Sequence, residues 1–401
     1  MFRTHRTTNT VGSTVGTTRG RWRLAAAAAA AGLTLAGCGS SGGDDSDTDT
    51  DSGGGGGGTD CTEQNLAFLG ALTGDAGALG QNMVYGIKTA LEEHNAEAEC
   101  EVGLKEFDSQ GSPEKAPALA TQIVGDDTVI GLVGPGFSGE SLATGKTFFE
   151  AGLPSISPSA TNVTITEQGW TTWHRVIGND EAQGQADAKY LTETVGAKKV
   201  YIVDDAQDYS KGLATVVRDA LGDAVVGSDQ IQVGQTDMSS VVTKVTSSGA
   251  DAVFYGGYYT EAGLMTKQLR QAGFEGTFMS GDGSQDPAFV EVAGKAAEGA
   301  LLSAPAAPAD AEFAAKVKEV TGNDAGLYTT QSYDVANIFL AALDDGATDA
   351  EAINTFIGEY TGDGVSGPIA FDEKGDITET TIYAYEVKDG ELDVENPTPI
   401  E

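Results

Sequence analysis

Short apolar runs alternate with amphipathic stretches along most of this chain, and that alternation limits the fold more than any other feature. Each run is continuous, which is typical of a strand that is buried on both faces of a sheet. The stretches between the runs repeat apolar residues at helical spacing. We predict strands at residues 66–72, 101–107, 129–133, 200–203, 252–255 and 277–279. The predicted helical faces carry Met83, Ile87, Ala90 and Leu91, then Leu213, Val216, Val217, Ala220 and Leu221, then Ala262, Met265, Leu269 and Ala272, and then Phe313, Val317 and Val320.

Strands that alternate with helices of this length predict βαβ units and parallel sheets, so the expected fold class is α/β. Residues 66–156 read as one such set and residues 199–303 as another. The folded part of the chain is long enough for two domains of ordinary size. We expect the irregular stretch at residues 170–180 to cross between two lobes. The helices after residue 310 are expected to pack back on the first lobe.

The N-terminal segment has the three parts of a secretory signal. Five arginines precede an apolar run at residues 24–35, which ends in Leu35-Ala36-Gly37-Cys38. The run is too short to span a bilayer, which takes about 20 apolar residues, and its context is that of a signal peptide. The last four residues resemble the lipobox of bacterial lipoproteins, which implies that Cys38 is acylated and becomes the mature N-terminus. An ordinary secretory signal with an incidental cysteine, or an alanine-rich core helix, is the alternative.

Residues 39–60 contain only Gly, Ser, Asp and Thr, the composition of a flexible linker. We therefore predict a signal peptide at residues 1–37, followed by an acylated cysteine and a disordered tether at residues 38–60. The mature protein would then be held at the outer face of the cytoplasmic membrane, where it has no ATP or NADH pool to use.

Acidic residues far outnumber basic ones, with 60 Asp and Glu against 23 Lys and Arg and a formal charge of −37. Cleavage of the leader would remove five arginines and no acid, which takes the charge to −42. Such a surface repels nucleic acid, so we expect no nucleic-acid partner.

Two cysteines remain beyond the leader, and each lies just before a predicted strand. The strands that follow Cys61 and Cys100 are parallel neighbours in a doubly wound sheet, so their starts lie close together. An oxidising compartment then favours a Cys61–Cys100 disulfide, which would stabilise the domain by about 2–4 kcal/mol. Two free buried thiols are the alternative.

Motifs for catalysis are sparse. The histidines are His5, His94 and His174, and none has a neighbour at metal-ligand spacing. No Gly-x-Ser-x-Gly pattern marks a nucleophile and no Walker loop is present. We therefore predict no metal site, no cofactor and no enzymatic activity, although a paired-carboxylate hydrolase stays open in a chain this acidic.

Two turns follow neighbouring predicted strands at the edge where open α/β sheets bind ligands. Residues 134–139 match G-x-G-x-x-G, but the exported location and the position after the third strand argue against a dinucleotide. Backbone amides at a helix N-terminus attract any anion, including a carboxylate, and Ser138 stands where an N-cap is expected. The second turn, residues 157–162, is rich in hydroxyls. Two plain turns are the alternative.

Several blocks of the chain resemble the leucine/isoleucine/valine-binding proteins of ABC importers. The more specific ones are Tyr255-Gly256-Gly257-Tyr258-Tyr259 and Phe371-Asp372-Glu373-Lys374-Gly375-Asp376. Residues 157–162, 170, 183–184, 188–190, 294–299 and 367–368 match in the same order. The resemblance implies a type I periplasmic-binding-protein fold, with two doubly wound parallel-sheet lobes joined by three hinge crossings. Lobe 1 would hold residues 61–178 plus 305–380, and lobe 2 residues 179–304 plus 381–396.

The resemblance also implies a ligand site between the lobes. The turn with Phe137 and Ser138 would receive the α-carboxylate of an amino acid. The second turn would reach the carboxylate and the α-amine through Ser159, Ala160 and Thr161.

The remaining implied contacts close the site around the ligand. Asp282, followed by Gly283, stands where the family has an acid for the ammonium group. Tyr209 and Tyr258 match aromatics that close from the other lobe. Tyr328 matches an aromatic near the side-chain pocket, and Leu79 stands where some relatives carry another aromatic.

This set of residues suits a zwitterion, which needs donors for its carboxylate, an acid for its ammonium group and an apolar wall. The implied function is that of a monomeric solute-binding lipoprotein that captures an amino acid, branched-chain Leu, Ile or Val, by hinge closure. It would deliver this ligand to the membrane permease of an ABC transporter. Asp282 as a solvated turn acid and Tyr258 as a core residue are the plainer interpretations. A binder of amides or urea, a sensor for a membrane receptor and an extracellular hydrolase remain alternatives.

Overall fold

The computed structural model describes residues 62–400 of the 401-residue chain. Cys38, Cys61 and the whole leader and tether lie outside the described residues. No helix within residues 62–400 combines the length and the apolar character that a membrane span needs.

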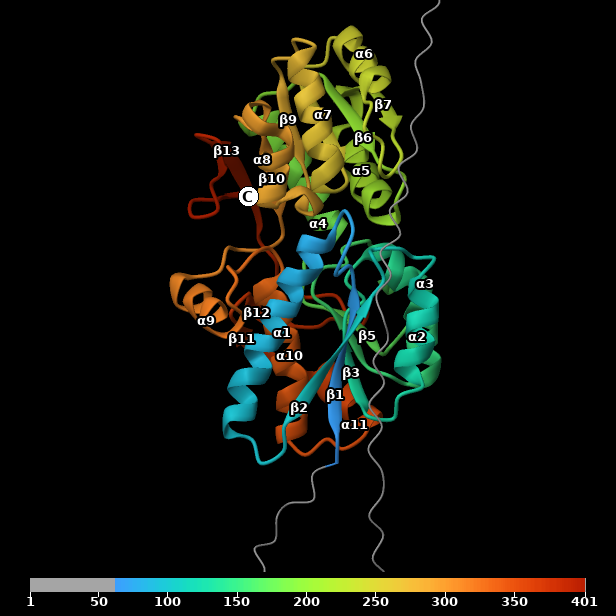
Figure 1. The fold of residues 1–401 in the computed structure, drawn as a ribbon. Coiled ribbons are helices and arrows are strands. Elements are labelled where there is room, and N and C mark those ends of the chain that lie inside the picture. The colour runs from blue at the N-terminus through green and yellow to red at the C-terminus, as the bar shows by residue number, and fades with distance from the viewer. Residues whose placement is uncertain (1–61, 401) are drawn as a thin grey trace, which may run out of the picture. The chain divides into compact units, whose positions relative to one another are not determined.

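The first sheet has five parallel strands in the order β2-β1-β3-β4-β5. Its strands are β1 (Gln64–Gly70), β2 (Val102–Asp108), β3 (Val129–Val133), β4 (Ser155–Ser157) and β5 (Trp173–Arg175). Helices α2 (Ala116–Val124) and α3 (Ser138–Ala151) cover one face, and α1 (Gly77–Glu97) lies on the other (Figure 1). This is a doubly wound order: the first strand lies inside the sheet, β2 is added on one side of it and β3 to β5 are added on the other, so the strand order reverses between β1 and β3.

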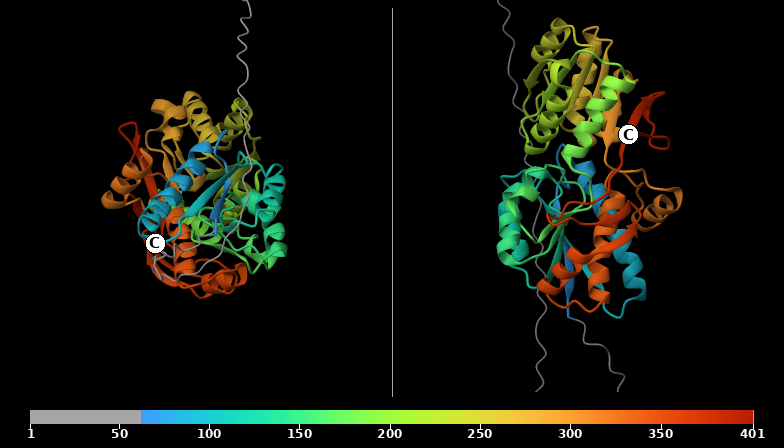
Figure 2. Two further views of the ribbon diagram at one scale, coloured as in Figure 1. Left: turned by 60° about the horizontal axis from the view of Figure 1, so that its bottom comes forward. Right: turned by 180° about the vertical axis from the view of Figure 1, so that it is seen from behind.

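The second sheet repeats the same order as β7-β6-β8-β9-β10 and then continues with C-terminal strands. Its parallel strands are β6 (Val200–Asp204), β7 (Val225–Gln230), β8 (Ala252–Gly256), β9 (Thr277–Ser280) and β10 (Leu301–Ala304). Its helices are α4 (Asp180–Lys189), α5 (Asp208–Leu221), α6 (Ser239–Ser248), α7 (Tyr259–Gln271) and α8 (Pro287–Ala293). Strand β13 (Ile382–Lys388) pairs antiparallel with β10, and β14 (Glu391–Leu392) and β15 (Thr398–Ile400) pair with β13 (Figure 2).

The remaining elements belong with the first sheet. Helix α9 (Ala311–Thr321) and helix α10 (Thr329–Asp344) pack against α1, and α11 (Ala350–Glu359) packs against α10. The hairpin of β11 (Thr361–Gly364) and β12 (Gly367–Ala370) follows. The prediction that helices after residue 310 return to the first lobe is confirmed. We call the first sheet with its helices lobe 1 and the second sheet with its helices lobe 2.

Three segments cross between the lobes, and they meet at one glycine. The crossings follow β5, β10 and β12. A Cβ atom on Gly178, in the first crossing, would lie 2.5 Å from Oγ1 of Thr380 and 3.0 Å from Cβ of Pro305. Those residues belong to the third and second crossings, so only glycine lets the three segments approach this closely. The stretch predicted as an irregular crossing is partly a strand, because β5 adds residues 173–175 to the first sheet.

Candidate functional site

A small cavity lies where the strand ends of the two lobes face each other. Eight of the eleven residues that the sequence predicts as ligand contacts line it, together with Gly136. These eight are Phe137, Ser138, Ser159, Tyr209, Tyr258, Asp282, Gly283 and Tyr328. Seven of them come after β3, β4, β6, β8 and β9, so the cavity lies at the edge where doubly wound sheets bind ligands. The eighth, Tyr328, is the N-cap residue of α10.

The lobe 1 wall presents hydrogen-bond donors. Helix α3 begins at Ser138, and the first amides of a helix have no partner within the helix. The Ser138 side chain does not cap α3, contrary to the prediction, because Phe137 is the N-cap residue and makes no side-chain bond. Instead, the amide of Asn162 donates to Oγ of Ser138 at 3.2 Å, which leaves the Ser138 hydroxyl proton free to point to a ligand oxygen.

The second turn adds a hydroxyl acceptor beside these donors. Ser159 donates its hydroxyl proton to the carbonyl of Gly136 at 2.6 Å. Its oxygen therefore keeps lone pairs that can accept a hydrogen bond from an ammonium group. The same bond ties the two turns of lobe 1 together at the floor of the cavity.

The opposite wall carries one carboxylate held by two tyrosines. Tyr209 donates to Oδ1 of Asp282 at 2.7 Å, and Tyr328 donates to Oδ2 at 2.5 Å. The amide of Gly283 donates to the hydroxyl oxygen of Tyr209 at 2.9 Å. Tyr328 comes from lobe 1 and Asp282 from lobe 2, so this pair is a direct hydrogen bond across the cleft. The sequence predicts Tyr328 near the side-chain pocket, whereas in the structure its hydroxyl is hydrogen-bonded to Asp282.

Asp282 is 1% exposed, and its burial raises the pKa of the carboxyl above the ordinary value. Hydrogen bonds from Tyr328, Tyr209 and Gln183 favour the ionised form and oppose that rise. A carboxylate has about four acceptor positions, and the two tyrosines take one on each oxygen, so the carboxylate can still accept from a cationic group. The site can thus hold a positive charge at one end and a negative charge at the other.

Aromatic rings form the wall between these two ends. The Tyr258 ring lies 5.7 Å from the Phe137 ring and 5.3 Å from the Tyr209 ring, measured between centroids. Phe137 belongs to lobe 1 and the two tyrosines to lobe 2, so the contact also bridges the lobes. This wall can take an apolar side chain of a small ligand.

Three residues predicted as ligand contacts do not line the cavity. Leu79 is buried in α1 within the main core cluster. The carbonyl of Ala160 accepts a hydrogen bond from Arg175 at 2.9 Å, and the carbonyl of Thr161 accepts one from the amide of Asp180 at 2.9 Å. Both carbonyls are therefore directed to the segment behind the second turn.

Sequence reasoning missed the buried charges behind the site. Burial, with a further contribution from the nearby Asp282, raises the pKa of Asp180 to about 7, although the Thr161 hydroxyl and Arg175 oppose the rise. Arg175 is fully buried and pairs with Asp376. An arginine directly before the apolar pair Val176-Ile177, in a chain with few basic residues, was the available signal.

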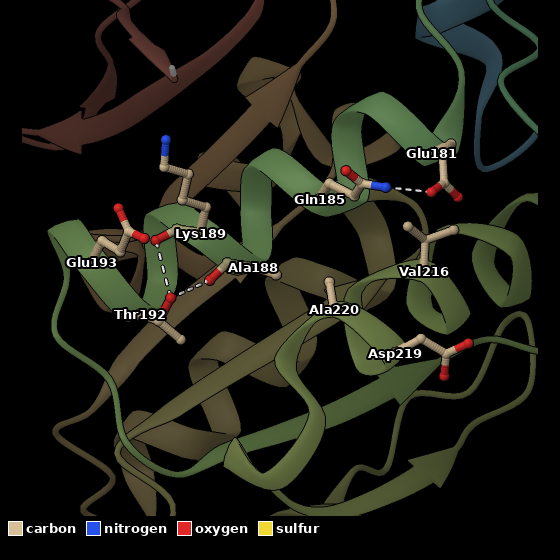
Figure 3. Close-up of a pocket in the computed structure, with 9 residues that line it drawn as sticks. All are labelled: Glu181, Gln185, Ala188, Lys189, Thr192, Glu193, Val216, Asp219 and Ala220. Carbon is tan, nitrogen blue, oxygen red and sulfur yellow. Dashed lines mark hydrogen bonds between the residues drawn. The ribbon is translucent and has the colours of Figure 1, made fainter.

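Other candidate sites lack this convergence. Within residues 62–400, no group of three or more His, Cys, Asp or Glu side chains could hold a metal ion. Burial lowers the pKa of His174 to about 4, and its ring packs edge-on against Phe371, as expected of a structural residue. A groove of about 590 Å³ lies between α4 and α5, but exposed side chains such as Glu181, Glu193 and Asp219 line it, and none of the predicted contacts does (Figure 3).

The fold and the site together define a two-lobed solute-binding protein with its ligand cavity between the lobes. The chain matches the family model described as periplasmic binding protein over residues 63–391. The leucine-specific-binding protein of Salmonella typhimurium is 32% identical over 324 residues, which are 78% of this chain and 87% of that protein. The Leu/Ile/Val-binding protein of Escherichia coli K12 is 30% identical over 322 residues, with the same coverage. The chain therefore belongs to the periplasmic binding protein family, as the resemblance to leucine/isoleucine/valine-binding proteins predicts.

Solved structures confirm the type I periplasmic-binding-protein fold. A leucine binding protein from Thermotoga maritima has a TM-score of 0.77 at 30% identity and covers 84% of this chain and 98% of that one. Another similar structure is that of a branched-chain amino acid transporter substrate binding protein from Streptococcus pneumoniae in complex with isoleucine. It has a TM-score of 0.79 at 25% identity and covers 84% of this chain and 99% of that one. A solute binding protein from R. palustris in complex with 4-hydroxybenzoate shares the fold, with a TM-score of 0.74 at 21% identity, and covers 82% of this chain and 95% of that one. At the family level these are solute-binding proteins and not enzymes.

Proposed function

We propose that this protein captures a free branched-chain amino acid, leucine, isoleucine or valine, and delivers it to the permease of an ABC importer. The observation that carries the proposal is the cavity with two unlike ends. Asp282 stands at one end, and Ser138 with the N-terminus of α3 stands at the other. A zwitterionic amino acid supplies the matching charges, and both must be hydrogen-bonded once they are removed from water.

Capture works by hinge closure. Ligand contacts come from both lobes, so only the closed arrangement makes all of them at once, and the ligand favours that state. The bond between Tyr328 and Asp282, and the bond at 2.7 Å from Nδ2 of Asn162 to the carbonyl of Asp208, support a closed state that brings the two walls together.

The chemistry of the cavity favours an amino acid over an aromatic acid. A benzoate-type ligand brings no cation for Asp282, whereas an amino acid does.

The test is isothermal titration of the ligand-stripped full chain with leucine, isoleucine and valine, and with acetamide, urea and 4-hydroxybenzoate. We expect binding of at least one of the three amino acids and none of the neutral or aromatic solutes. Binding of acetamide or urea alone would move the protein to the amide-binding alternative. Chromatography of the bound ligand after release should return it unchanged, and any turnover would favour a hydrolase.

The proposal includes how the protein is anchored and built. We infer that residues 1–37 are cleaved, that Cys38 is acylated, and that a monomer with lobes divided at residues 178, 304 and 380 works at the outer face of the cytoplasmic membrane. A Cys61–Cys100 disulfide fits this exported location. Mass spectrometry of the native membrane fraction should find diacylglyceryl-modified Cys38 and, after non-reducing digestion, a peptide pair linked through Cys61 and Cys100. A Cys38→Ala variant should be lost from the membrane fraction.

A further inference from the structure

Behind the second turn, an ion pair between the buried Arg175 and the partly buried Asp376 contacts the backbone that faces the cavity. Nε of Arg175 donates to Oδ1 of Asp376 at 2.5 Å, and its Nη1 donates to the carbonyl of Ala160 at 2.9 Å and to that of Asn162 at 3.1 Å. Arg175 is 0% exposed. One side chain therefore holds two carbonyls of the second turn, which also includes Ser159 and Thr161.

These bonds fix which way the turn presents its amides. A trans peptide unit is planar, so its carbonyl and the following N–H point in opposite directions. The Ala160 carbonyl is directed to Arg175, which aims the amide of Thr161 away from Arg175. The Thr161 carbonyl accepts from the amide of Asp180, and the amide of Asn162, which shares that peptide unit, donates to Oγ of Ser138 in the cavity wall.

The ion pair is itself held in place by its surroundings. Thr166 accepts from Nη2 of Arg175 at 3.3 Å and donates to Oδ2 of Asp376 at 3.2 Å. The amide of Arg175 donates to the carbonyl of Gly375 at 2.9 Å. The guanidinium carbon lies 5.2 Å from the centre of the Trp173 ring. Arg175 lies at the start of the first crossing, and Asp376 lies just before the third. The pair therefore links both crossings to the second turn.

We propose that Arg175 and Asp376 are positioning residues that orient the second turn, and through it Ser138, for the carboxylate of the ligand. Neither residue lines the cavity, so both act through the backbone. The inference rests on the proposed function, since it assigns the pair to one half of an amino-acid site. It predicts that damage to the pair weakens recognition of the carboxylate and leaves recognition of the ammonium group nearly intact.

The test compares Asp376→Asn with a matched control, Asp334→Asn, in the full chain. Asp334 is another hydrogen-bonded acid of lobe 1, 4% exposed, and accepts from Val365 and Ser366 without contact to the second turn. The probes are leucine and leucinamide, which keeps the ammonium group and side chain but replaces the carboxylate by a neutral amide. We expect Asp376→Asn to raise the Kd of leucine at least tenfold and that of leucinamide less than threefold. Asp334→Asn should change both Kd values less than threefold.

Hydrogen exchange adds a readout that needs no ligand. The amides of Thr161 and Asn162 should exchange at least tenfold faster in Asp376→Asn than in the unsubstituted chain, and at the original rate in Asp334→Asn. If Asp376→Asn does not fold, Thr166→Val replaces it, because this substitution removes one hydroxyl that is bonded to both charged groups. It should raise the Kd of leucine and the exchange rates of the two amides about threefold.

Equal losses of affinity for leucine and leucinamide in Asp376→Asn would overturn the positioning role. Unchanged Kd values together with unchanged amide exchange rates would also overturn it. Failure of the proposed function would look different. The unsubstituted chain would then bind no leucine, isoleucine or valine, while the exchange experiment would still decide whether the pair orients the turn.

Discussion

Asp282 and Asp286 lie four residues apart in the sequence, yet they have different roles in the structure. Asp282 faces the cavity and accepts from Tyr209 and Tyr328, while Asp286 caps α8 by accepting from the amide of Ala288 at 2.9 Å. Asp282→Ala should raise the Kd of the amino-acid ligand at least a hundredfold, because the ammonium group would lose its only acidic partner in the cavity. Titration calorimetry measures this loss.

Asp286→Ala is the matched control at this scale. It removes a cap, which costs about 1 kcal/mol of folding free energy, and it should leave the Kd within about threefold. Equal effects of the two substitutions on affinity would count against the ammonium contact and favour Asp282 as a purely structural acid.

The buried acid Glu140 is expected to make the stability of the protein depend on pH. It lies in the first turn of α3, fully buried, and accepts a hydrogen bond from the hydroxyl of Ser109. Burial raises its pKa from 4.5 to about 8. Below pH 4.5 the carboxyl is protonated in both the folded and the unfolded chain. Between pH 4.5 and about 8, the Glu140 carboxyl ionises readily only in the unfolded chain. This group therefore makes the free energy of unfolding fall as pH rises.

The Glu140→Gln substitution removes that titration. From pH 5 to pH 7 the variant should gain at least about 1 kcal/mol in free energy of unfolding relative to the unsubstituted chain, since each pH unit in this window is worth up to about 1.4 kcal/mol. Urea unfolding at both pH values measures the difference. Glu150→Gln, at the exposed end of the same helix with 64% of its side chain accessible, should show no such gain. Parallel pH profiles for Glu140→Gln would show that Glu140 is ionised in the folded protein.

At the scale of elements, the hinge depends on close approach at Gly178. A methyl group there would overlap Thr380 and press on Pro305. Gly178→Ala should therefore lower the free energy of unfolding by about 1–3 kcal/mol through overpacking. It should also weaken ligand binding, because the three crossings could no longer close together. Urea unfolding and calorimetry check the two effects.

Gly358→Ala provides the opposite expectation at a glycine with open space around it. Gly358 lies in α11, and a Cβ atom there would meet nothing within 4 Å. The substitution should stabilise the protein by about 0.5–1 kcal/mol, because alanine loses less conformational freedom in a helix. A stabilising Gly178→Ala would mean that the crossings are not packed as closely as the structure has them.

How far the sequence predicts the structure also differs between elements. Strand β3 falls at the predicted residues, and β1, β2, β6, β8 and β9 lie within three residues of the predicted bounds, because buried parallel strands are continuous apolar runs. Strand β7 was missed, since Val225–Gln230 is only half-buried at the sheet edge and carries polar residues. The pairing of Arg175 with Asp376 was also missed, because it joins positions 201 residues apart that no local pattern connects.

Across the whole described chain, hydrogen bonds between the lobes are expected to stabilise the closed state that we propose. Tyr328 has a φ of 70°, a left-handed conformation that few residues other than glycine adopt, and its hydroxyl reaches Asp282 across the cleft. Strained backbone of this kind is kept where the surrounding structure determines it. In the proposed mechanism, the hydroxyl stabilises the closed state before any ligand is present, and the ligand adds its own contacts to the same carboxylate.

Tyr328→Phe removes that hydroxyl and leaves the ring. A hydrogen bond to a charged group contributes about 1.5–3 kcal/mol, so the Kd of the amino acid should rise about tenfold or more. Small-angle scattering should show a larger radius of gyration for the ligand-free variant than for the ligand-free unsubstituted chain. Saturating ligand should bring the two to the same value. Tyr333→Phe is the matched control, because its hydroxyl, on the same helix, donates to Glu93 at 2.6 Å within lobe 1. An unchanged radius and Kd for Tyr328→Phe would mean that the ligand alone draws the lobes together.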